Sequence, residues 1–161
     1  MEWKIPPVAK VYEALSCIGS DHVEFVSENR ALVTSSEGDK KYNVIFDLRT
    51  NSITSDDNGS RWQGYLGYPS IAVLMLKGAL PFEPEFAQAL KGIRWRKLNE
   101  KYKRNYDLAI KEALEIARER GCDTKKLVEF ANKVIEEIER KRFRKLILKT
   151  RRRDGGEGVQ A

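Results

Sequence analysis

Residues 42–54 read Tyr-Asn-Val-Ile-Phe-Asp-Leu-Arg-Thr-Asn-Ser-Ile-Thr, and this stretch decides the fold class. Residues 42–46 are rich in β-branched and aromatic side chains, which favour a strand, and Thr50-Asn51 predicts a turn into a second strand at 52–54. Strands so close together in sequence must pair antiparallel, because a parallel pair needs a long crossover. The stretch therefore predicts an antiparallel hairpin.

The residues before this hairpin extend it into a meander. Residues 22–26 and 31–34 are further strand candidates, separated by turn signals at Asn29-Arg30 and at residues 37–39. Apolar residues recur at helical spacing over residues 8–15, and Gly19 ends that run. We therefore expect a short amphipathic helix followed by three or four antiparallel strands.

The residues after the hairpin predict helices. Residues 70–80 follow Pro69 and are apolar nearly all round, which is typical of a buried helix, and we expect this one to lie across the sheet. Further helices are predicted at 85–91, at 94–120, and from 124 to about 149 with Asp123 as N-cap. The fold class is thus α+β: a small antiparallel meander sheet packed on helices, followed by a basic C-terminal helical hairpin. The expected organisation is an α+β domain at 1–80, a helical extension at 81–149 and a flexible tail at 150–161.

Charge is distributed unevenly along the 161 residues, whose formal net charge is +6. Residues 1–80 carry 8 Lys/Arg and 10 Asp/Glu, whereas residues 81–161 carry 22 and 14. An excess of positive charge in one half of a chain favours a polyanionic partner for that half.

Two clusters account for most of this basic charge. Residues 91–104 contain one acid, Glu100, and residues 140–153 contain none. The candidate nucleic-acid-binding residues are Lys91, Arg94, Trp95, Arg96, Lys97, Lys101, Lys103 and Arg104 in the first cluster, and Arg140, Lys141, Arg142, Arg144, Lys145, Lys149, Arg151, Arg152 and Arg153 in the second.

Like charges at helical spacing repel one another, and a phosphate backbone would relieve that repulsion. Arginine outnumbers lysine in the second cluster, which favours bidentate phosphate contacts, and the interleaved Trp95, Tyr102 and Tyr106 could stack on unpaired bases. The alternative is a solvated basic face in which Trp95 belongs to the core and the two tyrosines pack between helices.

Residues 42–76 resemble the layout of a SWIM domain. The matching features are Tyr42-x-Val44-x-Phe46-Asp47, then Ser-Ile-Thr-Ser-Asp at 52–56, then Gly67-Tyr68-Pro69 leading into an apolar helix that reads Ala72-Val73-Leu74. The resemblance implies binding to DNA or proteins, with some family members working beside recombinase paralogues.

In that family a Cys-x-Cys hairpin and a Cys-x-His pair bind zinc. The corresponding positions here are Ser52, Thr54, Gly67 and Pro69, none of which supplies a thiolate or an imidazole. We therefore expect the unit to be held together without zinc, and we expect no other metal or cofactor.

The loop at residues 56–64 is a candidate recognition surface because Arg61 and Trp62 are flanked by glycines. The alternative is a loop whose Trp62 packs into the core and whose glycines serve turns, and we favour that alternative.

Catalytic signals are weak. His22 is the single histidine, and it has no serine or cysteine motif around it. Asp47, Asp56 and Asp57 could in principle hold Mg²⁺ as in a nuclease, but no motif surrounds them. We expect a protein that is not an enzyme.

Cysteine usage and the N-terminus predict a cytoplasmic protein without a membrane segment. Cys17 and Cys122 lack CxxC spacing and are expected to be reduced core thiols, and residues 1–7 do not form a signal peptide. Abundant Lys, Arg and Glu with only three Gln favour a thermophilic source.

The function predicted from the sequence is non-catalytic nucleic-acid binding by the basic C-terminal half, with RNA or single-stranded nucleic acid favoured. The first alternative is a protein-interaction subunit of a recombination, repair or ribonucleoprotein complex. The second is a Mg²⁺-dependent nuclease. The sequence does not define the oligomeric state.

Overall fold

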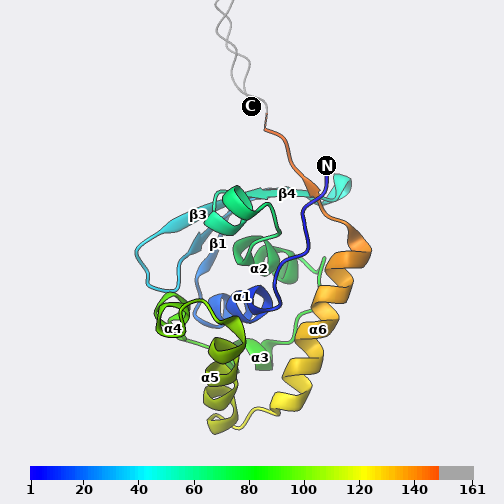
Figure 1. The fold of residues 1–161 in the computed structure, drawn as a ribbon. Helices are drawn as coiled ribbons and strands as arrows, with labels where there is room; N and C mark the ends of the chain where they lie inside the picture. The colour runs from blue at the N-terminus through cyan, green and yellow to red at the C-terminus, as the bar shows by residue number, and fades with distance from the viewer. Residues whose placement is uncertain (149–161) are drawn as a thin grey trace, which may run out of the picture.

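The computed structural model describes residues 1–148, and Figure 1 shows a sheet lying over a group of helices. The sheet has five strands in the order β1-β2-β3-β4-β5, and its first three pairings are antiparallel. The predicted α+β class is confirmed. No helix within residues 1–148 is both long enough and apolar enough to cross a membrane.

Strands β1 (Val23–Ser27), β2 (Arg30–Thr34), β3 (Lys41–Asp47) and β4 (Ser52–Ser55) form the predicted meander. A short 3₁₀ turn, η1 (Leu48–Thr50), joins β3 to β4 and ends at Asn51, whose φ of 57° is left-handed. The Asp47 carboxylate accepts a hydrogen bond from the Arg49 backbone N–H at 3.1 Å and fixes this turn. An Asx turn followed by a left-handed Asn is a local solution that the sequence signals well.

Helices α1 (Ala9–Gly19) and α2 (Tyr68–Leu76) lie beneath the sheet and form the centre of the core. Every residue from 69 to 75 is buried, which confirms the buried helix expected here, although it ends at Leu76 rather than at residue 80. Gly78 follows it with a φ of 80°. A helix that is apolar on all sides needs such complete burial because it has no face to offer to water.

The prediction of a single helix over residues 94–120 is wrong. After α3 (Pro84–Ala89), the chain forms α4 (Trp95–Lys101) and α5 (Tyr106–Glu119) as separate helices. Lys103 and Arg104 break the segment with φ values of 52° and 66°, and the Asn105 side chain then caps α5 by accepting a hydrogen bond from the Leu108 N–H.

The last helix is also shorter than predicted. Helix α6 (Thr124–Lys141) begins at the expected N-cap, Asp123, whose side chain accepts hydrogen bonds from the N–H groups of residues 125 and 126. It ends where Arg142 turns left-handed, and the chain then adds β5 (Arg144–Lys145) to the sheet, parallel to β4. The prediction that this helix continues to about residue 149 is therefore wrong for residues 142–148, which are not helical.

Helices α5 and α6 meet at their connecting loop and then diverge, with α1 and α3 lying between them in Figure 1. Their apolar faces join the same buried cluster as the sheet and α2. Residues 1–80 and 81–149, distinguished in the sequence as a domain and its extension, thus share one core as far as residue 148. The predicted tail at 150–161 lies outside the described residues.

Candidate nucleic-acid site

A cleft with a volume of about 890 Å³ opens between α1, the turn joining β2 to β3, and α4 with the loop before it. A further wall is the single π-helical turn η2 (Gly59–Gln63). The volume of the cleft lies in the range of ordinary small-ligand sites. Both features singled out in the sequence contribute to the lining, namely Trp62 from the glycine-rich loop and Lys91, Arg94, Trp95, Arg96 and Arg104 from the first basic cluster.

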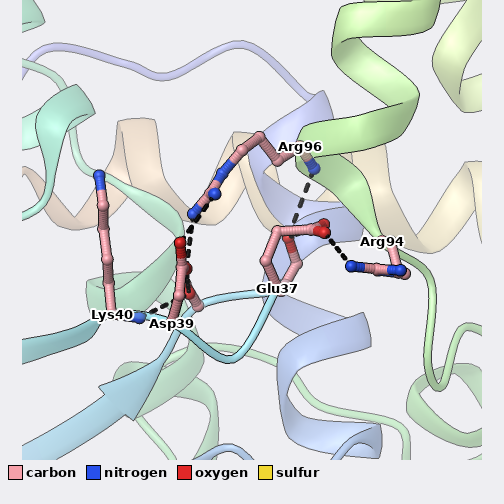
Figure 2. A network of polar contacts seen from close by, with 7 residues as sticks. Glu37, Asp39, Lys40, Arg94 and Arg96 are labelled. Carbon is pink, nitrogen blue, oxygen red and sulfur yellow. Dashed lines mark hydrogen bonds and ion pairs between the residues drawn. The ribbon is translucent and has the colours of Figure 1, made fainter.

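Two of these arginines fix one wall of the cleft in place. Arg94 pairs with Glu37 at 2.6 Å, and Arg96 forms two hydrogen bonds to Asp39, at 2.9 and 2.7 Å (Figure 2). Hydrogen bonds from Arg96 lower the pKa of the Asp39 carboxyl well below its usual range, with a further contribution from Ser35. The turn between β2 and β3 is thereby attached to α4 by charge-assisted contacts.

The inner part of the cleft contains a charged pair from one turn of α1. Lys10 Nζ lies 3.0 Å from Glu13 Oε2, and the two side chains are only 13% and 7% exposed. Burial raises the pKa of Glu13, while Lys10 and the neighbouring Asn99 act in the opposite direction. Burial alone would lower the pKa of Lys10, but Glu13 together with Tyr65 and Tyr106 raises it to about 12.

Two polar atoms of α4 are buried without a hydrogen-bond partner among residues 1–148. They are the indole Nε1 of Trp95 and the amide Oδ1 of Asn99, both from residues that line the cleft. Buried polar atoms are rarely left unsatisfied in folded proteins, so each one needs an explanation such as a ligand or a bound water.

The η2 turn presents Trp62 to solvent. Asp57, which is buried, accepts hydrogen bonds from the backbone N–H of Ser60 at 3.2 Å and from its hydroxyl at 2.7 Å, and Gly64 ends the turn with a φ of 76°. A Cβ on Gly67 would collide with the Asp57 carboxylate, so glycine is needed behind it. Trp62 is 73% exposed, which overturns the expectation that it packs into the core, and Arg61 is exposed beside it.

The first basic cluster is divided by the fold. Trp95 is 3% exposed and belongs to the core, so its ring is not free to stack on a base. Lys101 pairs with Glu112 at 2.7 Å and lines, with Lys97, a smaller pocket behind α4. Within residues 1–148, Lys91, Lys97, Lys103 and Arg104 are exposed and form no ion pair.

The described residues of the second basic cluster, 140–145, lie at the C-terminal end of α6 and in β5, across the molecule from α4 (Figure 1). Arg140 pairs with Glu137 at 2.7 Å, and Arg142 pairs with Glu2 at 3.0 Å, so acids outside residues 140–153 neutralise part of the cluster. Lys145 lies over the Trp3 ring, 4.8 Å from its centroid. Lys141 is half-buried, Arg144 is exposed, and Lys149, Arg151, Arg152 and Arg153 lie outside the described residues.

The three aspartates considered as Mg²⁺ ligands of a nuclease each form hydrogen bonds with different neighbouring groups. Asp47 caps η1, Asp56 accepts a hydrogen bond from the Asn43 N–H at 2.8 Å, and Asp57 holds η2. No group of three or more His, Cys, Asp or Glu residues that could hold a metal ion occurs within residues 1–148. His22 is half-buried and lines the cleft, while Cys17 and Cys122 are free thiols.

Sequence reasoning missed Lys10, Glu13 and Asn99, which are the polar groups of the cleft interior. One signal was available for the first two residues. Lys10 and Glu13 are separated by one helical turn and interleaved with the buried Val11, Tyr12 and Ala14, so a charged pair falls where the helix should be apolar. Asn99 carried no comparable signal, because its place in the cleft depends on where the fold puts α4.

The fold and the cleft define an α+β protein with a cleft that combines a basic rim with a buried charged pair. Residues 3–144 match the family described as "Uncharacterised conserved protein UCP014422", and the chain belongs to this family. The match includes every residue that lines the cleft. No curated protein and no solved structure matches the chain.

Proposed function

We propose that this protein binds single-stranded nucleic acid, with RNA favoured, along the rim of the cleft and without catalysis. The observation that carries the proposal is the position of Trp62: this 73% exposed indole lines the same cleft as the cations Lys91 and Arg104. An exposed aromatic ring beside a positively charged groove is the arrangement by which proteins bind unpaired strands.

The energetic argument begins with exposure. Trp62 is more exposed than any other aromatic side chain among residues 1–148, so its apolar surface is available for a contact that removes it from water. Every base has a π-face, so stacking on Trp62 contributes about 1–3 kcal/mol per base with little sequence preference.

Electrostatics provide the second part of the argument. The lining of the cleft includes Lys10, Lys91, Arg94, Arg96 and Arg104 against Glu13, Glu37 and Glu100, so basic side chains outnumber acidic ones. Lys91 and Arg104 line the cleft, Lys103 directly precedes Arg104 in the chain, and no carboxylate within residues 1–148 pairs with any of these three cations, so they are the candidates for phosphate contacts. Each phosphate they neutralise releases counterions, and binding should therefore weaken as salt rises.

A second group of cations adjoins the far side of the η2 loop. A Cβ on Gly64 would lie 3.8 Å from Lys4 Cε and 4.0 Å from Lys145 Nζ. A strand stacked on Trp62 could therefore run from Arg104 across the loop towards the second basic cluster. The resemblance of residues 42–76 to SWIM domains is consistent with this proposal, since nucleic-acid binding is one role that the resemblance implies.

The proposal includes a cytoplasmic location, because free thiols such as Cys17 and Cys122 are typical of reducing compartments. Its test is a salt titration of binding to RNA, single-stranded DNA and duplex DNA. Replacing Lys91, Lys103 and Arg104 with Gln should reduce the salt slope by roughly two, since each phosphate contact on a single strand contributes about 0.7.

A matched control replaces Lys125, Lys126 and Lys133 with Gln, because these exposed lysines lie on α6, away from the cleft. It should leave the slope unchanged. Binding to none of the three nucleic acids at about 50 mM salt, where phosphate contacts are strong, would refute the proposal and favour the protein-interaction subunit. Mg²⁺-dependent cleavage of any of them would favour the nuclease.

A further inference from the structure

A second, smaller cavity lies beside the cleft. It has a volume of about 290 Å³ and is lined by the loop before α4, by α4 itself and by α5 with its C-cap, Arg120. Gly92, Ile93 and Arg94 line both this cavity and the cleft, so the two hollows share one wall. The rim cation Lys91 directly precedes that wall in the chain. A strand held by Lys91 therefore lies beside the smaller cavity.

The lining of this cavity is strongly basic. Arg94, Lys97 and Lys101 are separated by three and four residues, so they lie along one side of α4 and its preceding residue. Like charges at this spacing repel one another, and a bound anion would relieve that repulsion. The α5 side adds a fourth cation, Arg120, and a single acid, Glu112.

Two of the four cations already have carboxylate partners. Arg94 pairs with Glu37 at 2.6 Å, and Lys101 pairs with Glu112 at 2.7 Å. Lys97 is exposed and forms no ion pair within residues 1–148. The charge of Lys97 is therefore available to an anion in the cavity.

Arg120 is the second cation that no carboxylate of the described chain neutralises. Its Nη1 donates to the backbone carbonyl oxygens of Ala89 at 3.0 Å and of Lys91 at 2.8 Å, which fixes the guanidinium in place. A carbonyl carries no net charge, and the guanidinium has further N–H groups to donate. Lys97 and Arg120 together leave two positive charges uncompensated at the cavity.

The floor of the cavity is apolar and closed. Ile93 and Leu98 are each only 7% exposed, and the half-buried Ile116 lines the cavity with them. A strand cannot continue through such a floor, so a chain end suits the cavity better than an internal phosphate diester does. A terminal phosphate monoester carries close to two negative charges at neutral pH, which matches the two uncompensated cations.

We propose that the cavity between α4 and α5 binds the terminal phosphate monoester of the strand, with Lys97 and Arg120 as its principal contacts. This inference rests on the proposed function, because it names the part of the bound strand that enters the cavity. A free nucleoside monophosphate offers the same group, so the test includes one as a separate ligand.

The test measures binding of oligouridine strands about eight nucleotides long, a length that one binding groove accommodates. The strands carry a 5′-phosphate, a 3′-phosphate or hydroxyls at both ends. The strand whose phosphate enters the cavity should bind roughly 10-fold more tightly than the hydroxyl strand, the effect of one charge-assisted hydrogen bond. Comparison of the two phosphorylated strands identifies which end is bound.

Variants of Lys97 assign the contact. Lys97→Gln should remove most of the advantage of the phosphorylated strand while leaving the affinity of the hydroxyl strand nearly unchanged. Lys97→Glu should make the phosphorylated strand bind more weakly than the hydroxyl strand. The side chain is exposed, so both variants should fold. Lys111→Gln is the matched control, because this exposed lysine lies on α5 without lining the cavity, and its variant should keep the full advantage.

Uridine monophosphate distinguishes a strand end from a free phosphorylated molecule. It should compete with the phosphorylated strand only at millimolar concentration, because it lacks most of the stacking and phosphate contacts at the rim of the cleft. Uridine monophosphate that binds as tightly as the phosphorylated strand would overturn the assignment to a strand end and identify a small phosphate monoester as the ligand.

The remaining outcomes separate this inference from the proposed function. Equal binding of the phosphorylated and hydroxyl strands would overturn the phosphate cavity and leave strand binding intact. Binding of none of the strands would overturn both. An advantage of the phosphorylated strand that survives Lys97→Glu would also overturn the assignment, because the phosphate would then be bound elsewhere.

Discussion

Arg96 and Asp39 are joined by two parallel hydrogen bonds, from Nη1 to Oδ2 at 2.9 Å and from Nη2 to Oδ1 at 2.7 Å. The pair connects the first turn of α4 to the turn between β2 and β3, and the Arg96 backbone N–H adds a hydrogen bond to the Ser36 hydroxyl. Arg96 therefore shapes the wall of the cleft, and its guanidinium is already occupied by a carboxylate.

Asp39→Asn should weaken the attachment of α4 in a pH-dependent manner. The pKa of Asp39 is lowered in the folded protein by its hydrogen bonds from Arg96, so its contribution to stability is present above the unfolded pKa of about 3.9 and is lost as pH falls below it. The melting temperature of the variant should lie below that of the wild type at neutral pH and converge with it in acid. A gap that persists unchanged in acid, or a similar gap for the exposed Glu28→Gln, would contradict this account.

Trp62→Ala should separate binding from stability. Because the side chain is 73% exposed, the free energy of unfolding should change by no more than about 0.5 kcal/mol. Binding to single strands should weaken by about 1–3 kcal/mol while the salt slope stays the same, since stacking releases no counterions. Calorimetric titration measures the change in binding, and thermal unfolding measures the change in stability. Unchanged affinity would remove Trp62 from the interface.

Trp95→Ala should show the opposite pattern. The indole is 3% exposed and packs in the central core, so its removal should lower the free energy of unfolding by about 3–5 kcal/mol. Denaturant unfolding measures this loss. A variant that unfolds like the wild type would show that Trp95 does not stabilise the core.

Local signals in the sequence predict the meander, α1, α2 and the Asp123 cap, because each depends on residues that are close together in the chain. The break before α5 depends on left-handed Lys103 and Arg104, which are neither glycine nor asparagine, and such conformations are set by tertiary contacts. Asn105 followed by Asp107 was a usable signal for the start of α5. Strand β5 has only two residues and pairs with β4, which is distant in the sequence, so no local sequence pattern predicts it.

The candidate site likewise contains residues that the sequence could predict and residues that only the folded structure identifies. Basic rim residues such as Lys91 and Arg104 follow from charge counting, because charged side chains reach the surface whatever the fold. The cleft interior requires residues of α1 and α4 to face the same cleft, and only the folded chain places Asn99 in that cleft with Glu13. Ion pairs from distant acids, such as Glu2 with Arg142, could not be anticipated either.

Leu74→Asp should unfold the protein. Leu74 is fully buried in α2 at the centre of the core, and a carboxylate there has no partner. Circular dichroism should show loss of the cooperative transition. Leu108→Asp is the matched control, because this leucine is 42% exposed on α5 and its variant should melt close to the wild type. Wild-type melting of Leu74→Asp would mean that α2 is not core.

The Lys10–Glu13 pair should make stability fall at alkaline pH. The pKa of Lys10 is raised from 10.5 to about 12 in the folded protein, so its contribution of about 2 kcal/mol is fully present below pH 10.5 and is lost as pH rises through about 12. In Glu13→Gln the ammonium loses its carboxylate, and only Tyr65 and Tyr106 then oppose the effect of burial on its pKa. The difference in unfolding free energy between wild type and Glu13→Gln should therefore shrink as pH rises.

Urea unfolding between about pH 10 and pH 12 measures this difference. Taking the difference cancels the titration of other groups, such as Tyr12 and Cys17, whose pKa values burial raises to about 12. Glu112→Gln provides the comparison, because the Lys101–Glu112 pair is exposed and solvent screening should leave only a small pH-dependent difference. A difference for Glu13→Gln that is constant across the alkaline range would show that the pair does not stabilise the fold through its charge.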